Sequence, residues 1–374
     1  MTSDASPAIR LRRGTVARVE AAGAAVRLEV ALPDEAEPAP AIAYPALTGV
    51  PEVGDVVVVN TTARTLGLGT GGLDLVVAVE GRVPPDPGPG ARTMKARYLP
   101  HQVAVRSVEE DHPEALGPSA TLSGVPVVAA PLHSLVAPIA AGARAAGARR
   151  IAFVMTDGAA LPAAFSDLLR TLRGSGFVDA SVTVGQAFGG DLEAVTLWSG
   201  LLAAVTVADA EVVIVADGPG NLGTATTWGV SALASGLALN AARLLGGSPV
   251  AALRISFADP RPRHRGLSHH SRTILGEVCT VEANVAVPVL EGEQRSAIWE
   301  ALRAARLEER HQLVEADGRP ALDALADAGV TVRSMGRSAE DDPAFFLAGG
   351  AAGVLAARMA VGGRRWRPDV TSGR

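Results

Sequence analysis

The sequence predicts an α/β protein in which a doubly wound, mainly parallel, Rossmann-like sheet follows a small N-terminal β-barrel-like or sandwich domain. Three observations predict this fold. Short β segments separated by turn residues fill the chain up to about residue 82. From about residue 120, short apolar runs alternate with longer helical patterns, as a parallel sheet buried on both faces requires. The length of 374 residues exceeds that of one ordinary domain.

The N-terminal β segments end in a linker. Residues 82–92 are rich in proline and glycine, so we expect an all-β domain with its linker over 1–95 and an α/β domain over 96–374. The first 95 residues contain one aromatic residue, Tyr44, whereas base-stacking platforms need several. This disfavours a nucleic-acid-binding barrel. The predicted β segments are 14–20, 25–32, 53–60 and 73–81.

The α/β region has the sequence pattern of a buried parallel sheet. Its apolar runs are bounded by Gly, Asp or Pro and are separated by helical patterns. Further units of strand or helix length follow at 311–317, 322–329 and 330–336. The predicted strands are 125–130, 149–155, 180–184, 210–216 and 249–257, with strand material at 276–290. The predicted helices are 135–148, a segment ending at 173–176, 192–208, 224–247, a segment around 298–305, and 345–360.

Composition restricts the classes of partner. Hydrophobic residues make up 48% and charged residues 20%, which is typical of a globular chain, and the net charge of −5 provides no basic field for nucleic acid or an anionic membrane. A single cysteine, Cys279, excludes an internal disulfide framework and fits a reducing cytoplasm. Residues 1–14 lack the apolar region of a secretory signal, so we expect a cytoplasmic protein. The apolar stretch Ala194–Ala208 is shorter than the roughly 20 residues of a membrane span, and none is predicted.

A glycine-rich turn follows the predicted strand 210–216 and matches the pattern G-x-G-x-x-G. Glycines let the backbone approach a ligand, and free N–H groups at the start of a following helix attract a phosphate or carboxylate. A nicotinamide dinucleotide fingerprint and a merely tight turn are the alternatives, and Pro219 and the distant Asp259 weaken the former. The candidate residues of the turn are Asp217, Gly218, Gly220, Asn221, Gly223 and Thr224.

The segment 259–272 concentrates four arginines and three of the chain's seven histidines after a predicted strand. Arg261, Arg263 and Arg265, at alternate positions, could clamp an anion bidentately. The histidines could bind a divalent metal together with Asp217 or Asp259, or one of them could act as a general acid or base. The alternative without a ligand or a catalytic role is a solvated basic loop or a subunit contact. The candidate catalytic residues are His264, His269, His270 and Asp217.

Isolated polar residues carry weaker predictions. His133 follows the first strand of the α/β region. Its position favours a hydrogen-bonded cap over a role as a partner in the site. Asp157, like Asp217, follows a predicted strand and could orient a base, hold a ribose hydroxyl or cap a helix. Cys279 favours buried packing over a nucleophilic role, and Ser268 does not lie in a G-x-S-x-G elbow.

The stretches GPGNLGTATTWG, at 218–229, and RISFADPRPRHRGLSHHS, at 254–271, together resemble an uncharacterised bacterial family, domain of unknown function family 3866. The resemblance extends over nearly the whole chain, including the N-terminal β region. It implies no reaction, cofactor or catalytic residue. The site assignments therefore rest on the chemistry of the residues.

Three functions follow from these residues. The first is an enzyme in which the glycine turn holds a small anionic ligand, the arginines neutralise it and a histidine moves a proton, in hydrolysis or group transfer. The second is a non-catalytic metabolite-binding or regulatory protein, and the third is a metal-dependent hydrolase. All three expect the glycine turn and the segment 259–272 to share one hollow. The sequence specifies neither cofactor nor metal, and a homo-oligomer is expected only from the frequency of symmetric assemblies.

Overall fold

The computed structural model describes residues 9–361 apart from residues 22, 70 and 85. Residues 1–8, part of the stretch read above for a secretory signal, lie outside this range. The chain divides into two compact units, one built from residues up to 91 together with 97–104, and the other from 92–96 together with the residues from 105 onward.

The first unit is a closed five-stranded barrel with the strand order β1-β2-β3-β5-β4, in which β1 also pairs with β4. Alternate residues of β2 point inward, and Val26, Leu28 and Val30 are buried. Closure leaves no exposed sheet edge. The predicted barrel-like domain is thus confirmed. Its elements are β1 (Leu11–Ala21), β2 (Val26–Ala31), β3 (Ala39–Ala43), α1 (Pro45–Thr48), β4 (Val56–Asn60), α2 (Thr62–Thr65) and β5 (Asp74–Val79).

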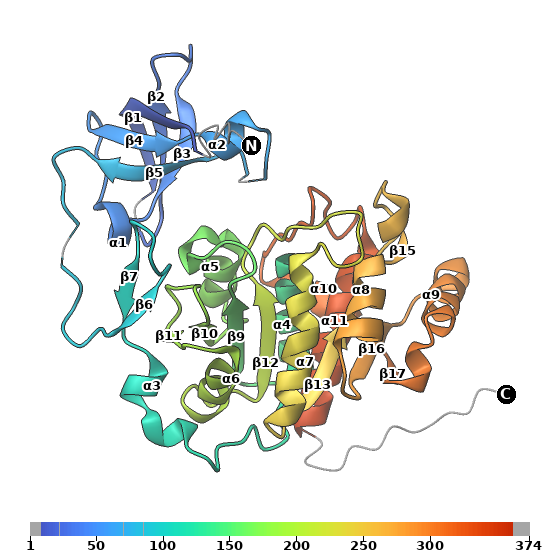
Figure 1. The fold of residues 1–374 in the computed structure, drawn as a ribbon. Coiled ribbons are helices and arrows are strands. Elements are labelled where there is room, and N and C mark those ends of the chain that lie inside the picture. The colour runs from blue at the N-terminus through green and yellow to red at the C-terminus, as the bar shows by residue number, and fades with distance from the viewer. Residues whose placement is uncertain (1–8, 22, 70, 85, 362–374) are drawn as a thin grey trace, which may run out of the picture. The chain divides into compact units, whose positions relative to one another are not determined.

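The second unit contains an eight-stranded sheet whose strands are all parallel, which confirms the predicted doubly wound architecture (Figure 1). The order is β11-β10-β9-β12-β8-β13-β16-β17. From β8 the chain forms β9, β10 and β11 on one side, returns to insert β12 between β8 and β9, and then forms β13, β16 and β17 on the other side. The strands are β8 (Pro126–Ala129), β9 (Ile151–Thr156), β10 (Ala180–Thr183), β11 (Leu192–Glu193), β12 (Val212–Asp217), β13 (Ser248–Ala252), β16 (Asn284–Pro288) and β17 (Gln312–Ala316).

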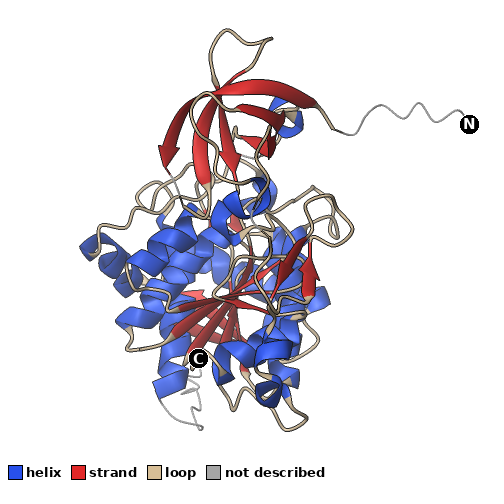
Figure 2. Ribbon diagram, turned by 90° about the vertical axis from the view of Figure 1, so that its left-hand side faces the viewer, coloured by secondary structure: helices blue, strands red, loops and turns tan. Residues whose placement is uncertain are grey.

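Helices cover both faces of this sheet, as Figure 2 shows. One core lies beneath α4 (Val136–Ala145), α5 (Asp167–Gly174), α10 (Arg319–Asp327) and α11 (Pro343–Val361). The other lies beneath α6 (Leu197–Thr206), α7 (Ala234–Leu244) and α9 (Gly292–Ala304). Every residue of β9 and β12 is buried, because both faces of these strands are covered. The shorter elements are β6 (Thr93–Lys95), β7 (Val103–Val105), α3 (Val108–Asp111), β14 (Ile255–Ser256), β15 (Gly266–Leu267) and α8 (His269–Thr273).

Helix α11 is the longest described apolar helix and the one that meets the length and hydropathy of a membrane span. However, 72% of its 18-residue window is buried inside the fold, where it packs against α4, α10 and β16. Glycines allow this close packing: a Cβ at Gly353 would overlap the Ile139 carbonyl oxygen of α4, and one at Gly142 would overlap the Gly350 carbonyl oxygen. The apolar composition of α11 therefore reflects burial between helices and sheet.

Several predicted element boundaries are wrong. The predicted helix 192–208 begins with strand β11, and α6 starts only at Leu197. The described residues 330–336 form neither strand nor helix. The predicted helix 224–247 is a loop up to residue 230, and α7 begins only at Ala234. The hydroxyl of Thr224 accepts a hydrogen bond from the Thr226 amide and donates to the Gly229 carbonyl, so local side-chain bonds replace helical ones. The predicted strand 276–290 is strand only over β16, because the chain first forms α8 and a π-helical turn at 274–278. An apolar run of this length does not distinguish strand from buried helix.

Candidate functional site

The glycine turn and the segment 259–272 meet at the carboxyl end of the sheet. The turn follows β12, and the segment follows β13 and β14 and includes β15, which pairs with β14. A Cβ at Gly223 would lie 3.1 Å from Cε1 of His270 and 3.7 Å from its Nε2. A side chain at position 223 would therefore press on the histidine ring. The glycine turn does not begin a helix, so the helix N-terminus expected to attract an anion there is absent from the described loop 218–230.

Asp217 holds the start of the glycine turn. It is 4% exposed, and its carboxylate accepts hydrogen bonds from the Thr156 hydroxyl at 2.6 Å, the Gly158 amide at 3.1 Å and the Asn221 amide at 2.7 Å. Burial raises the pKa of this carboxyl above its ordinary value. These contacts fit a positioning role for Asp217 and Asn221. Asp157 is not a helix cap, because its carboxylate accepts a hydrogen bond from the Gln186 backbone amide.

His133 lies beneath the glycine turn as a neutral, hydrogen-bonded residue. Its Nδ1 lies 2.9 Å from the Asp217 carbonyl oxygen, so Nδ1 carries the proton and Nε2 accepts from the Ser166 hydroxyl at 2.6 Å. The same hydroxyl oxygen accepts from the Leu169 amide and caps α5. Burial lowers the pKa of His133 to about 4.

Because unfolding exposes His133 and restores its ordinary pKa, the unfolded chain binds more protons than the folded chain between about pH 4 and 6.5. Stability is therefore expected to fall as pH decreases through this window, by about 3 kcal/mol from this residue. Urea unfolding across the window measures the slope of the free energy of unfolding against pH.

His133→Asn retains a donor for Asp217 but cannot titrate, and it should reduce this slope by up to about 1.4 kcal/mol per pH unit. His112→Asn, at a side chain that is 40% exposed, is the control and should leave the slope unchanged. An unchanged slope in His133→Asn would contradict the assignment.

Three histidine rings form one cluster. The ring centroids lie 5.0 Å apart for His264 and His269, 4.8 Å for His264 and His270, and 4.2 Å for His269 and His270. The Ser268 hydroxyl positions the cluster: it lies 2.9 Å from Nδ1 of His264 and accepts from the His270 amide at the start of α8. Burial, assisted by Arg254 and other neighbouring cations, lowers the pKa of His264 to about 3 and of His270 to about 4. The cluster is therefore neutral at physiological pH.

The hydrogen bond of Arg254 fixes the tautomer of His270. Arg254 Nη1 lies 3.3 Å from Nδ1 of His270, and a guanidinium can only donate. Nδ1 is consequently the acceptor, and in the neutral ring the proton lies on Nε2. That Nε2 is buried without a hydrogen-bond partner, as are Nε2 of His269 and Nε of Arg263. Three polar nitrogens of one segment thus lack a hydrogen-bond partner among the described residues.

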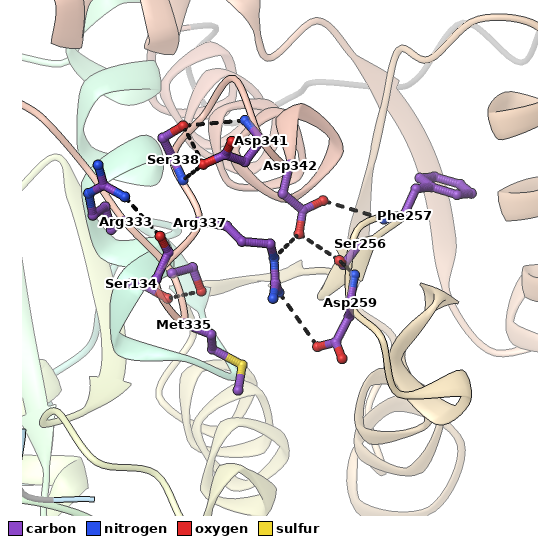
Figure 3. A network of polar contacts seen from close by, with 12 residues as sticks. Ser134, Ser256, Phe257, Asp259, Arg333, Met335, Arg337, Ser338, Asp341 and Asp342 are labelled. Carbon is purple, nitrogen blue, oxygen red and sulfur yellow. Dashed lines mark hydrogen bonds and ion pairs between the residues drawn. The ribbon is translucent and has the colours of Figure 1, made fainter.

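A network of arginines and aspartates adjoins the histidines. Asp259, 1% exposed, accepts two hydrogen bonds from the Arg261 guanidinium and lies 3.4 Å from Arg254 Nη2 and 3.6 Å from Arg337 Nη2. Figure 3 shows Arg337 between Asp259 and Asp342, and its Nε donates to Asp342 at 3.1 Å. Arg261 holds the pKa of Asp259 well below its usual range, and burial lowers the pKa of Arg254 to about 10. Three guanidiniums face two carboxylates, so this network has an excess of positive charge.

The model of the family described as protein of unknown function (DUF3866) matches residues 40–353, which include every residue of this cluster. The chain belongs to this family. No curated protein and no solved structure matches the chain. In this family member the site is accordingly interpreted from its own geometry.

The structure separates the three alternating arginines. Arg261 is committed to Asp259, Arg263 is half-buried beside the histidines, and Arg265 is exposed. Sequence reasoning gave no role to Arg254, Arg337, Asp342 or Met335. Arg254 had a signal, because it is the one charge inside the apolar run 249–257, whereas the others come from a loop about 80 residues away that carries no motif. Cys279 is fully buried, as predicted, and burial raises the pKa of its thiol.

Proposed function

We propose that the α/β unit binds a small anionic ligand, phosphorylated or carboxylated, between the histidine cluster and the neighbouring guanidiniums. The ligand then undergoes hydrolysis or group transfer, in which a histidine of the cluster moves a proton. The glycine turn closes one side of this site through Gly223. The position agrees with the general rule that open α/β sheets bind ligands at the carboxyl ends of their strands.

The observation that carries this proposal is the set of buried nitrogens without a hydrogen-bond partner: Arg263 Nε, His269 Nε2 and His270 Nε2. Each buried polar group left without a partner costs about 1–3 kcal/mol. An anion supplies acceptors to such donors and also balances the excess positive charge of Arg254, Arg261 and Arg337 over Asp259 and Asp342.

The histidines have distinct roles in this proposal. His270 donates through Nε2 and binds the anion, because Arg254 occupies its other nitrogen. His269 and His264 stay neutral at physiological pH, since burial and the neighbouring arginines lower their pKa values. A neutral imidazole has a lone pair that accepts a proton from water or a hydroxyl nucleophile, and the resulting imidazolium can return that proton to the leaving group.

A metal-dependent hydrolase is the second candidate, favoured by one observation: the three histidines offer ligand atoms within 4.8 Å of one another. Two features weigh against it. The tautomer of His270 places a proton on the nitrogen that would bind the ion, and several guanidiniums repel a cation. Metal analysis of the purified protein separates the two candidates, because a metal centre predicts one tightly bound ion per chain that His269→Gln removes.

His269→Gln and His270→Gln are each expected to weaken binding of inorganic phosphate by about 10- to 100-fold, since each removes a hydrogen bond to a charged group. Isothermal titration calorimetry at neutral pH measures the affinity. His112→Gln, at a partly exposed histidine outside the cluster, is the matched control and should bind like the wild type. Once a turnover assay exists, a catalyst should lose more turnover than affinity in His269→Gln. Equal phosphate affinity in all four proteins would contradict the proposal, as would the absence of binding by phosphate, pyrophosphate and acetate alike.

A further inference from the structure

The sulfur of Met335 contacts two guanidiniums of the arginine network. It lies 3.1 Å from Arg261 Nη2 and 3.7 Å from Arg254 Nη2, so two guanidiniums are directed at one thioether. The residue is 58% exposed, and its backbone has a φ of +51°, which a side-chain-bearing residue rarely adopts. Figure 3 shows it on the same turn as Arg337.

The turn around Met335 is itself well braced. Ser334 and Arg337 exchange two backbone hydrogen bonds, the Ser334 hydroxyl lies 2.9 Å from that of Ser134, and Arg333 donates to the Gly336 carbonyl. These contacts hold Met335 in the left-handed conformation. Residues held in such strained conformations concentrate at ligand sites and switch regions.

A thioether is a poor partner for a guanidinium. Sulfur is a weak acceptor, whereas a carboxylate or phosphate oxygen forms short, charge-assisted bonds with arginine. Arg254 is also buried, at 4% exposure, so water does not replace the missing acceptor freely. The sulfur therefore occupies a position that suits an anionic oxygen.

We propose, resting on the anion-binding function above, that the ligand carries a phosphoryl group and that its oxygens displace the Met335 sulfur from Arg254 and Arg261. Met335 then acts as a specificity-determining residue, because a ligand enters only if its interaction with the two arginines exceeds that of the thioether. The exposed Met335 side chain moves aside as the ligand binds, while the braced turn keeps its place.

The number of available donors favours a phosphoryl group over a carboxylate. Three buried nitrogens lack a hydrogen-bond partner, and Arg254 Nη2 and Arg261 Nη2 face the Met335 sulfur in addition to contacting Asp259, which makes five nitrogens in all. A carboxylate offers about four lone-pair sites in one plane. A phosphoryl group has three terminal oxygens pointing in different directions, and a pyrophosphate has more. Donors on both sides of Arg254, toward His270 and toward Met335, suit the tetrahedral group.

Two substitutions of Met335 test the proposal by calorimetric titration with inorganic phosphate, pyrophosphate and acetate. Met335→Glu should weaken phosphate binding by about 30-fold or more, because a tethered carboxylate reaches the two arginines at millimolar effective concentration or above. Met335→Ala removes the competing sulfur and should tighten phosphate binding by about 3- to 10-fold. Leu244→Glu, which adds the same charge at an exposed apolar residue of α7, is the control and should keep the wild-type affinity.

The outcomes separate this inference from the proposed function. Phosphate binding that is lost in His270→Gln but equal in wild type, Met335→Ala and Met335→Glu would overturn the displacement and leave the anion site standing. Acetate binding as tightly as phosphate would overturn the phosphoryl class. Failure of all three anions to bind the wild-type protein would remove the proposed function itself. Met335 lies on the surface of a turn, so both variants are expected to fold, and circular dichroism checks this.

Discussion

Replacing Asp259 with asparagine is expected to lower the free energy of unfolding of the α/β unit by about 3–5 kcal/mol. Asp259 is nearly fully buried and is shared by Arg254, Arg261 and Arg337. Asparagine has a similar shape but no charge, and its amide group adds donors where only acceptors are useful. The substitution would leave one carboxylate, that of Asp342, for three guanidiniums. An uncompensated charge in a buried position is among the largest destabilising changes that a single substitution makes.

Urea unfolding of the full chain measures this effect, and Asp327→Asn is the control. Asp327 is an exposed residue at the end of α10, where the same substitution should change stability by less than about 0.5 kcal/mol. The double variant Asp259→Asn with Arg261→Gln should recover part of the loss, because it removes one of the unpaired cations. Inorganic phosphate should also stabilise Asp259→Asn more than wild type if an anion enters this network. A loss below about 1 kcal/mol would show that the carboxylate does not compensate the arginines.

Gly353→Ala is expected to destabilise the α/β unit by about 3 kcal/mol. Gly353 lies on α11 where the helix crosses α4, and an added Cβ would overlap the Ile139 carbonyl oxygen and lie 2.7 Å from the Ala143 amide nitrogen. Backbone atoms of a helix cannot rotate away as a side chain does. The two helices must therefore separate, and α11 packs against the sheet as well as α4, so the separation loosens the core on that face.

Gly174→Ala is the matched control for this prediction. Gly174 ends α5, its φ is not positive, and an added Cβ would meet nothing within 4 Å. Alanine is the better helix former, so this variant should be neutral or slightly more stable. Thermal unfolding of both variants beside the wild type gives the comparison. Equal stability of Gly353→Ala and wild type would mean that the two helices are less closely packed than described here.

The fold class could be predicted from the sequence because its signal is local. The runs that form β8, β9 and β12 are short and almost entirely apolar, as strands buried on both faces require, and longer helical patterns separate them. The boundaries of the elements could be predicted less accurately. Residues 224–230 were read as the start of the helix 224–247, although hydrogen bonds of Thr224 hold them in a turn.

The candidate site was predicted in part. The histidines 264, 269 and 270 lie within six residues of sequence, so their concentration was visible. The position of Gly223 against His270 followed from the rule that loops at the carboxyl ends of neighbouring strands share one edge. The pairing of Arg261 with Asp259 was not predicted, because charge spacing along a loop does not show which carboxylate each guanidinium meets.

Hydrophobic periodicity and clustered cations are properties of short segments, so the order and type of the main elements and the loops that carry polar chemistry could be predicted without a structure. Which of those groups act together depends on how the whole unit folds. The tertiary structure brought Arg337, Asp342 and Met335 from a loop about 80 residues away onto Arg254 and Asp259, and it set the tautomer of His270 through a single guanidinium. Such contacts depend on folding of the whole unit, since each involves residues whose separation in sequence carries no information about their distance in space.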